Sequence, residues 1–322
     1  MPEPRNLNRR AWLTGASALA LNGCSWVSRD APLSILYTPA AKTSTPDRNP
    51  VIVIPGFLGS RLRDQDSGKL IWGAFDSEGV DPGSDNGYRL VSLAPANIFG
   101  MEHTPARPDG VLDHIRLSIA GIAFMLRPYA EILATLGAGG YRDEAMGLGG
   151  EINYGAEHFT CFQFAYDWRL DNAGNARRLN EYILDKRAYV QSEYKKHFDI
   201  ADADVKFDIV AHSMGGLLAR YFLMFGGKDL PADGTAPAPS WEGARHVGRA
   251  ILVATPNAGT LDSLRALVKG RDFGAPIIPA YRSSLLGTFP SLYQMLPRRR
   301  FNQVVWADTA SALDPFDPRI WH

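Results

Sequence analysis

Residues 206–216 read Lys-Phe-Asp-Ile-Val-Ala-His-Ser-Met-Gly-Gly, and this stretch decides the fold of the chain. Its first part, 206–211, is a short apolar run typical of a buried strand, and the apolar run 217–223 is typical of a helix. A serine between the two, flanked by small residues, matches a nucleophile elbow in which Ala211 replaces the first glycine. Such a turn raises the Ser213 hydroxyl above the sheet edge. We therefore expect Ser213 to be the nucleophile of an acyl-transfer reaction.

The tetrahedral intermediate of acyl transfer needs two backbone N–H donors. One is expected to be the N–H of Met214, directly after the serine. The second should come from the loop after an earlier strand, and the loop Pro55-Gly56-Phe57-Leu58-Gly59-Ser60 follows the apolar run 51–54. Its glycines let the backbone approach a substrate closely. We predict the Phe57 N–H as the second donor, with Leu58 as the next choice.

The same short apolar pattern recurs along the chain. It predicts strands at 51–54, 161–166, 206–211 and 250–254. Helices are predicted between them, one at 129–136 ended by Gly137 and one that Asp171 or Asn172 caps. Strands that alternate with helices indicate crossover connections. The fold class is therefore α/β, with a mainly parallel sheet flanked by helices.

Two further segments do not follow this alternation, residues 61–115 and a surface loop at 227–245. Residues 61–115 are rich in Gly, Pro, Asp and Asn, and a segment of this length inside a compact domain is typical of a cap or lid. The apolar stretch 118–126 is too short to span a bilayer, so we expect a core helix or a cover segment there.

The first 23 residues have the pattern of an export signal. A basic pair, Arg9-Arg10, precedes an apolar run at 11–21 that is too short for a membrane helix. The pair also resembles a twin-arginine signal. Residues 1–23 are therefore predicted to be a signal peptide.

Cys24 directly follows this signal. The sequence Leu-Asn-Gly-Cys at 21–24 resembles a bacterial lipobox, which implies a lipid anchor on Cys24 and a tether at 24–50. The alternative is an ordinary cleaved signal with an incidental cysteine. The lipobox reading predicts an exported lipoprotein held at a membrane surface of the bacterial envelope, and Ser25 favours the outer membrane.

Composition excludes several classes of function. The 34 Lys and Arg balance 34 Asp and Glu, so the chain lacks the basic excess that a nucleic-acid-binding face needs. Two cysteines are too few for a disulfide framework or a cysteine-rich metal site. Metal-binding His-Glu-x-x-His and phosphate-binding Gly-x-x-x-x-Gly-Lys motifs are also missing from the sequence. Acyl transfer through a serine needs neither metal nor cofactor, and we expect none.

Five stretches together resemble one known family. They are Ile54–Ser60, Gly140–Asp143, Tyr166–Leu170, Ala211–Gly215 and Ala254–Gly259. In this order they resemble the lecithin:cholesterol and phospholipid:diacylglycerol acyltransferases, in a bacterial version. The resemblance implies an α/β-hydrolase domain at 51–322 and a lid segment at about 261–300. It also implies that the serine takes an acyl chain from a glycerolipid or phospholipid and passes it to an alcohol or to water.

The stretch Tyr166-Asp167-Trp168-Arg169 has two interpretations. It follows a predicted strand, at the sheet edge where open α/β sheets place their sites, so it could line the acyl pocket. The alternative, which we favour, is an internal pair between Asp167 and Arg169 or a role in capping the next helix.

The resemblance also implies an aspartate and then a histidine after the serine. His246 precedes the strand 250–254 and comes too early, while His322 is the last residue. Asp308 and His322 could form an irregular triad. We favour the expectation that the carboxyl-terminal strands of the domain are missing, which would leave the strand 250–254 as an exposed apolar sheet edge.

Three functions remain open at this point. The first is a lipid acyltransferase, lipase or phospholipase that forms an acyl-enzyme on Ser213. The second is a catalytically impaired lipoprotein that binds lipid, because a triad aspartate and histidine are not recognised. The third is a serine esterase that acts on small, non-lipid substrates.

Overall fold

The structure is a computed structural model. It describes residues 45–75, 79–93, 106–112, 115–119, 122–126, 129–155, 158–233, 235–273 and 278–321. The predicted signal peptide 1–23, the predicted lipidation site Cys24 and most of the tether lie outside the described residues.

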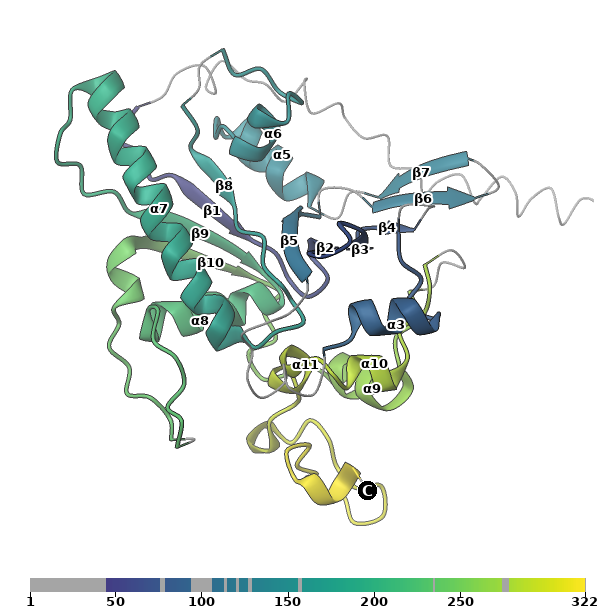
Figure 1. The fold of residues 1–322 in the computed structure, drawn as a ribbon. Coiled ribbons are helices and arrows are strands. Elements are labelled where there is room, and N and C mark those ends of the chain that lie inside the picture. Colours follow the sequence, from purple (N-terminus) through teal and green to yellow (C-terminus); the bar gives the residue numbers. More distant parts are fainter. Residues whose placement is uncertain are drawn as a thin grey trace, which may run out of the picture.

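A four-stranded parallel sheet forms the centre of the molecule (Figure 1). Its strands are β1 (Val51–Ile54), β8 (Cys161–Gln163), β9 (Phe207–His212) and β10 (Val247–Val253). Their order in the sheet is β10-β9-β1-β8. The predicted parallel sheet is therefore confirmed, although β8 ends three residues earlier and β10 begins three residues earlier than the sequence indicated.

Helices cover both faces of this sheet (Figure 1). They are α5 (Ala130–Ala138), α6 (Glu144–Leu148), α7 (Asn172–Phe198) and α8 (Met214–Phe225). In β1, Ile52 and Ile54 pack in the cluster that includes α7 and α8, whereas Val51 and Val53 pack in the cluster that includes α5 and α6. The unbroken apolar run of β1 follows from this burial on both sides.

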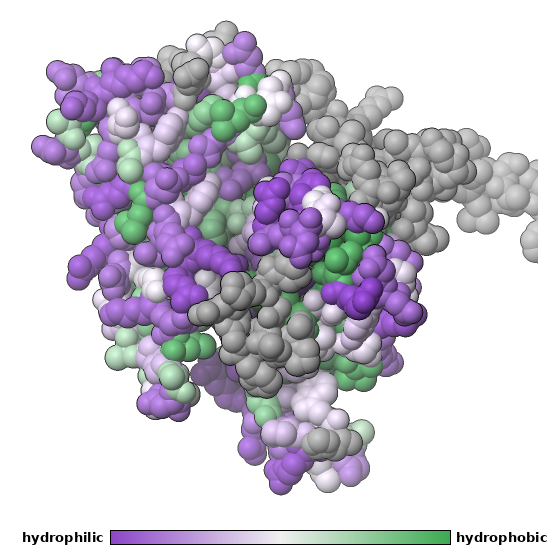
Figure 2. All heavy atoms as spheres, in the orientation of Figure 1, coloured by the Kyte–Doolittle hydropathy of each residue, from purple (hydrophilic) through white to green (hydrophobic). Residues whose placement is uncertain are grey.

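Helix α7 begins and is oriented as its sequence predicts. The Asp171 side chain accepts a hydrogen bond from the Gly174 N–H and caps the helix. Leu179, Ile183 and Val190 are buried. Figure 2 shows mostly hydrophilic residues over the region in which Figure 1 draws α7. This amphipathic pattern fixes α7 against the sheet.

The segment 61–115 carries its own strands. An antiparallel sheet contains β2 (Ser60–Asp64), β3 (Leu70–Trp72) and β5 (Ala106–Val111), and the helix α3 (Asp85–Val91) lies between β3 and β5 in sequence. A second small sheet contains β4 (Ala74–Phe75), β6 (Ile115–Ile119) and β7 (Ile122–Leu126).

The sequence analysis gave a core helix as one prediction for 118–126, and this prediction is wrong. Strands β6 and β7 pair in antiparallel fashion, with Ile119 opposite Ile122. In the sequence, Ala120-Gly121 interrupts the apolar stretch at its middle, and a glycine there is a turn signal. The run is therefore read better as two short strands than as one helix.

The segment 261–300 is helical. It contains α9 (Leu261–Lys269), α10 (Ser283–Leu286) and α11 (Pro290–Gln294), and the last residues of the chain extend beyond them (Figure 1). Single 3₁₀ turns occur at Gly243–His246, Arg299–Phe301 and Pro318–Trp321. Among the helices that the structure describes, none combines the length and apolar character needed to cross a membrane.

Strand β10 forms one edge of the central sheet. It pairs with β9 on one side, and its apolar side chains are open to solvent, with Ile251 52% exposed. Leu252 and Val253 are also exposed. This matches the exposed apolar edge that the sequence analysis expected for the strand 250–254.

Candidate active site

Ser213 occupies a strained turn between β9 and α8. Strand β9 ends at His212, α8 begins at Met214, and the serine between them has φ 52° and ψ −125°. A positive φ is unfavourable for a residue with a side chain, so surrounding contacts must hold it. The Ser213 N–H donates to the Val253 carbonyl at 2.8 Å and ties the turn to β10. The predicted strand, turn and helix are confirmed.

The two glycines after Met214 are required by close packing. A Cβ at Gly215 would lie 2.3 Å from the Pro55 carbonyl oxygen, and one at Gly216 would lie 1.8 Å from Thr255 Oγ1. Both contacts are far shorter than a carbon and an oxygen tolerate. The sequence pattern around the serine therefore reflects the approach of two neighbouring loops to the first turn of α8.

The loop after β1 packs directly against this turn. A Cβ at Gly56 would lie 2.8 Å from Ser213 Cβ, and Phe57 and Ser213 line the same cleft. The N–H groups of Phe57 and Met214 have no hydrogen-bond partner in the part of the chain that the structure describes. Neither predicted donor is therefore used by a hydrogen bond within the described residues. The second choice, Leu58, adopts a positive φ of 63° in the same loop.

The cleft around Ser213 has a volume of about 330 Å³. One wall comes from the segment predicted as a lid, through Asp262, Ser263, Ala266, Arg271, Leu292 and Met295. Helices α9 and α11 therefore border the serine, although they are distant from it in sequence. A cleft of this size suits a small molecule or part of a larger chain.

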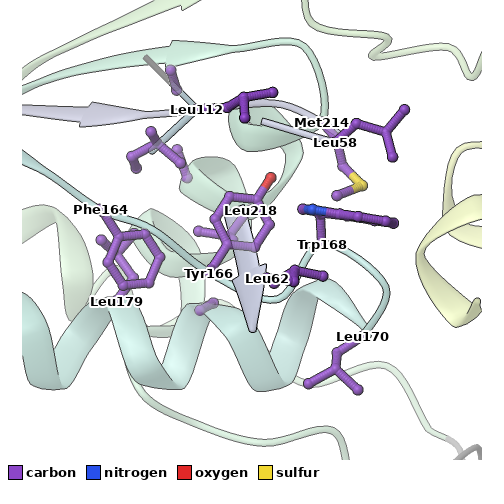
Figure 3. Packing of buried hydrophobic residues seen from close by; sticks show 14 of the residues in the cluster. Leu58, Leu62, Leu112, Phe164, Tyr166, Trp168, Leu170, Leu179, Met214 and Leu218 are labelled. Carbon is purple, nitrogen blue, oxygen red and sulfur yellow. The ribbon is translucent and has the colours of Figure 1, made fainter. Parts of the chain in front are cut away.

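Tyr166 and Trp168 hold the loop between Pro55 and Ser60 by hydrogen bonds. Figure 3 shows both side chains in the core together with Leu58 of that loop. The Tyr166 hydroxyl donates to the Pro55 carbonyl at 2.8 Å, and the Trp168 indole N–H donates to the Ser60 carbonyl at 3.0 Å. The ring of Trp168 also meets that of Phe57 edge to face, with centroids 5.0 Å apart. Both ends of the loop are therefore fixed by side chains in the core.

Asp167 and Arg169 form a buried, two-pronged ion pair. Arg169 Nε lies 2.9 Å from Asp167 Oδ1 and Arg169 Nη2 lies 2.7 Å from Asp167 Oδ2. The remaining Nη1 donates to the Val91 carbonyl at 2.9 Å. The internal pairing favoured from the sequence is confirmed. None of the four residues Tyr166–Arg169 lines the Ser213 cleft.

A tyrosine that the sequence analysis did not single out joins the site. Tyr129 Oη accepts the Gly56 N–H at 2.8 Å and lies 3.1 Å from Nδ1 of His212, which lines the cleft. Burial raises the pKa of Tyr129 and lowers the pKa of His212. Sequence reasoning placed Tyr129 only at the start of a helix. Its role depends on contacts with residues more than 70 positions away, for which the local pattern holds no signal.

The structure does not bring the remaining predicted residues to Ser213. Asp308 lies in an exposed turn between the paired residues Val305 and Ala312, and it does not line the cleft. His322 lies outside the described residues. His246 contacts Arg187 on α7 at 3.5 Å. Among the histidines that the structure describes, only His212 lines the cleft.

Cys161 is a buried free thiol, and burial raises its pKa. Across the described ranges, no group of three or more His, Cys, Asp or Glu side chains could hold a metal ion. In this part of the chain, the ionisable and nucleophilic side chains of the cleft are Ser213, His212, Asp262 and Arg271 with the hydroxyls of Thr260 and Ser263.

The sequence of the chain matches the model of one known protein family. The family model for lecithin:cholesterol acyltransferase matches residues 150–317, which is more than half of the chain. The chain belongs to the lecithin:cholesterol acyltransferase family. The match includes β8, the turn at Ser213 and the helices α9 to α11. The parallel sheet with its flanking helices is accordingly an α/β-hydrolase-like fold.

Among solved structures, the chain is similar to one described as the crystal structure of the Tle4-Tli4 complex. The TM-score is 0.43 at 14% identity, and the similarity covers 84% of this chain and 60% of that chain. This chain thus spans about three fifths of the length of the one that it matches. A search of curated proteins found no match to the sequence.

Proposed function

We propose that this chain transfers an acyl group from a glycerolipid or phospholipid ester through an acyl-enzyme on Ser213, as an acyltransferase, lipase or phospholipase. The observation that carries the proposal is the strained Ser213 turn in a cleft beside Phe57. Membership of the lecithin:cholesterol acyltransferase family supports a lipid ester as the acyl donor.

In this reaction Ser213 Oγ attacks the ester carbonyl and loses its proton to a general base. The N–H groups of Phe57 and Met214 hold the negative oxygen of the tetrahedral intermediate, and each such donor contributes about 3 kcal/mol. The leaving alcohol takes the proton from the base, and the acyl group stays on the serine. An alcohol or water then attacks the acyl-enzyme by the same steps in reverse.

The proposal requires a general base in addition to Ser213. In the described part of the chain, no histidine paired with a carboxylate borders the serine, because His212 is bonded to Tyr129. The described residues therefore do not identify a histidine base for Ser213. His322 is the histidine that the sequence analysis proposes for this role.

The same observation supports a second candidate function. A serine without a base is a weak nucleophile at neutral pH, whereas the cleft and the loop around it remain. In that case the chain binds a lipid acyl chain without turning it over. The lipid anchor predicted on Cys24 would hold either version at a membrane surface.

A lipid turnover assay tests the proposal. The 322-residue chain is incubated with mixed micelles of phosphatidylcholine, with and without a long-chain alcohol, and free fatty acid and new ester are measured. The proposal predicts release or transfer that Ser213→Ala abolishes. A product that is equal in the wild type and in Ser213→Ala would contradict it.

A second substrate separates the alternatives. If turnover of a water-soluble short-chain ester depends on Ser213 while micelles are not used, the chain is a non-lipid esterase. If neither substrate is turned over but a labelled fatty acid binds the chain, the impaired lipid-binding function holds.

A further inference from the structure

The hydroxyl of Tyr129 lies between the two loops that build the Ser213 site. It accepts the Gly56 N–H at 2.8 Å and lies 3.1 Å from His212 Nδ1. A Cβ added at Gly59 would lie 2.6 Å from Tyr129 Oη, so the hydroxyl occupies the space between the two glycines of the loop. Tyr129 therefore links the loop that carries Phe57 to the residue directly before Ser213.

The single proton of this hydroxyl determines the tautomer of His212. The Gly56 N–H is a donor, so it uses a lone pair of the tyrosine oxygen and leaves the tyrosine proton free. Within the described residues, the acceptor in reach of that proton is His212 Nδ1. A buried hydroxyl proton without an acceptor is costly, so Nδ1 should accept the proton and carry none of its own. The neutral ring then holds its proton on Nε2.

The protonation states of Tyr129 and His212 agree with this assignment of the tautomer. Burial raises the pKa of Tyr129, so its hydroxyl keeps the proton at neutral pH. Burial lowers the pKa of His212, so its ring is neutral there. The structure gives Nε2 no hydrogen-bond partner within the described ranges, and the ring lines the cleft.

We propose that Tyr129 is a positioning residue that fixes the Phe57 loop against the serine turn and holds His212 as the neutral Nε2–H tautomer. In this tautomer His212 offers a hydrogen-bond donor to a ligand in the cleft. It has no free lone pair with which to take the Ser213 proton, because Nδ1 is occupied and Nε2 is protonated. His212 is thus a hydrogen-bond donor in the cleft and is not the general base of the proposed reaction. The kinetic part of this inference rests on the proposed function.

The tautomer is tested by nitrogen NMR of the histidine rings. The Ser213→Ala chain is labelled with ¹⁵N-histidine, and the His212 signals are assigned by loss in His212→Gln. We expect the Nε2–H pattern in the parent chain and a mixture of tautomers after Tyr129→Phe, which leaves Nδ1 without its donor. An Nδ1–H pattern in the parent, or no change after Tyr129→Phe, would overturn the proposal.

Kinetics then separate positioning from general stability. The matched control is Tyr182→Phe on α7. It removes a hydroxyl that donates to the Gln163 carbonyl of β8 at 3.1 Å, and Tyr182 does not line the cleft. With a monomeric ester, Tyr129→Phe should lower kcat by about tenfold or more and leave KM within about twofold, since a lost hydrogen bond has this size. An equal effect of Tyr182→Phe would show that Tyr129 has only a structural role.

Failure of the proposed function is distinguishable from failure of this inference. If the wild type turns over no ester, the proposed function fails, while the NMR experiment on the Ser213→Ala chain still decides the tautomer. If the wild type is active and the NMR result is negative, the role of Tyr129 alone is rejected.

Discussion

The most informative substitution is Gly56→Ala, because it adds one methyl group between the Phe57 loop and the Ser213 turn. The added Cβ would lie 2.8 Å from Ser213 Cβ and 3.2 Å from the His212 carbonyl oxygen. Two carbon atoms in contact prefer about 3.6 Å, so the loop must move away by about 0.8 Å. A donor that starts about 2.9 Å from the oxyanion would end beyond about 3.5 Å and lose its hydrogen bond.

The loss of one oxyanion donor lowers kcat by about 10² to 10³, and this is the effect expected of Gly56→Ala. The assay is steady-state turnover of an ester, with circular dichroism melting to show that the variant is folded. The control is Gly137→Ala in α5, where the added Cβ meets no atom within 4 Å. It should leave kcat unchanged and stabilise the fold by about 0.5 to 1 kcal/mol. A folded Gly56→Ala variant with kcat within about threefold of the wild type would refute the assignment of the Phe57 loop as the source of an oxyanion donor.

Three other predictions concern stability and association. Burial lowers the pKa of His158 to about 4 from 6.5, so the unfolded chain binds the proton first as the pH falls through this window. Stability should then decrease by up to about 3 kcal/mol between pH 6.5 and 4, and melting curves should show a weaker decrease for His158→Phe. Arg169→Met removes the guanidinium that pairs with the buried Asp167 carboxylate and should cost about 3 to 5 kcal/mol in urea unfolding, while an unchanged midpoint would contradict the pairing. Ile251→Lys on the exposed edge strand should reduce concentration-dependent association in light scattering, and equal association would show that this edge is not involved.

Local patterns in the sequence predicted much of the central sheet and the serine turn. The strand at 51–54 and the cap Asp171 appear in the structure where they were expected, because a continuous apolar run and a capping side chain act over a few residues. The small residues around Ser213 were also informative as a motif, although the contacts that require Gly215 and Gly216 come from the distant residues Pro55 and Thr255.

Features that depend on distant contacts were harder to predict. Tyr129 belongs to the site through hydrogen bonds with Gly56 and His212, and the helical pattern that follows Tyr129 does not reveal them. The hairpin of β6 and β7 resembled a single apolar segment, because short apolar runs do not distinguish a helix from strands. Asp308 is a comparable case, since spacing from a predicted strand suggested a site that the exposed turn does not form.

Covalent labelling of the serine tests the central claim most directly. A fluorophosphonate reacts only with a serine whose hydroxyl is activated and whose product is held by oxyanion donors. Mass spectrometry of the 322-residue chain should find one phosphonyl group, located on Ser213 by peptide mapping and missing in Ser213→Ala. A chain that is folded but carries no label, or a label on another serine, would contradict the account.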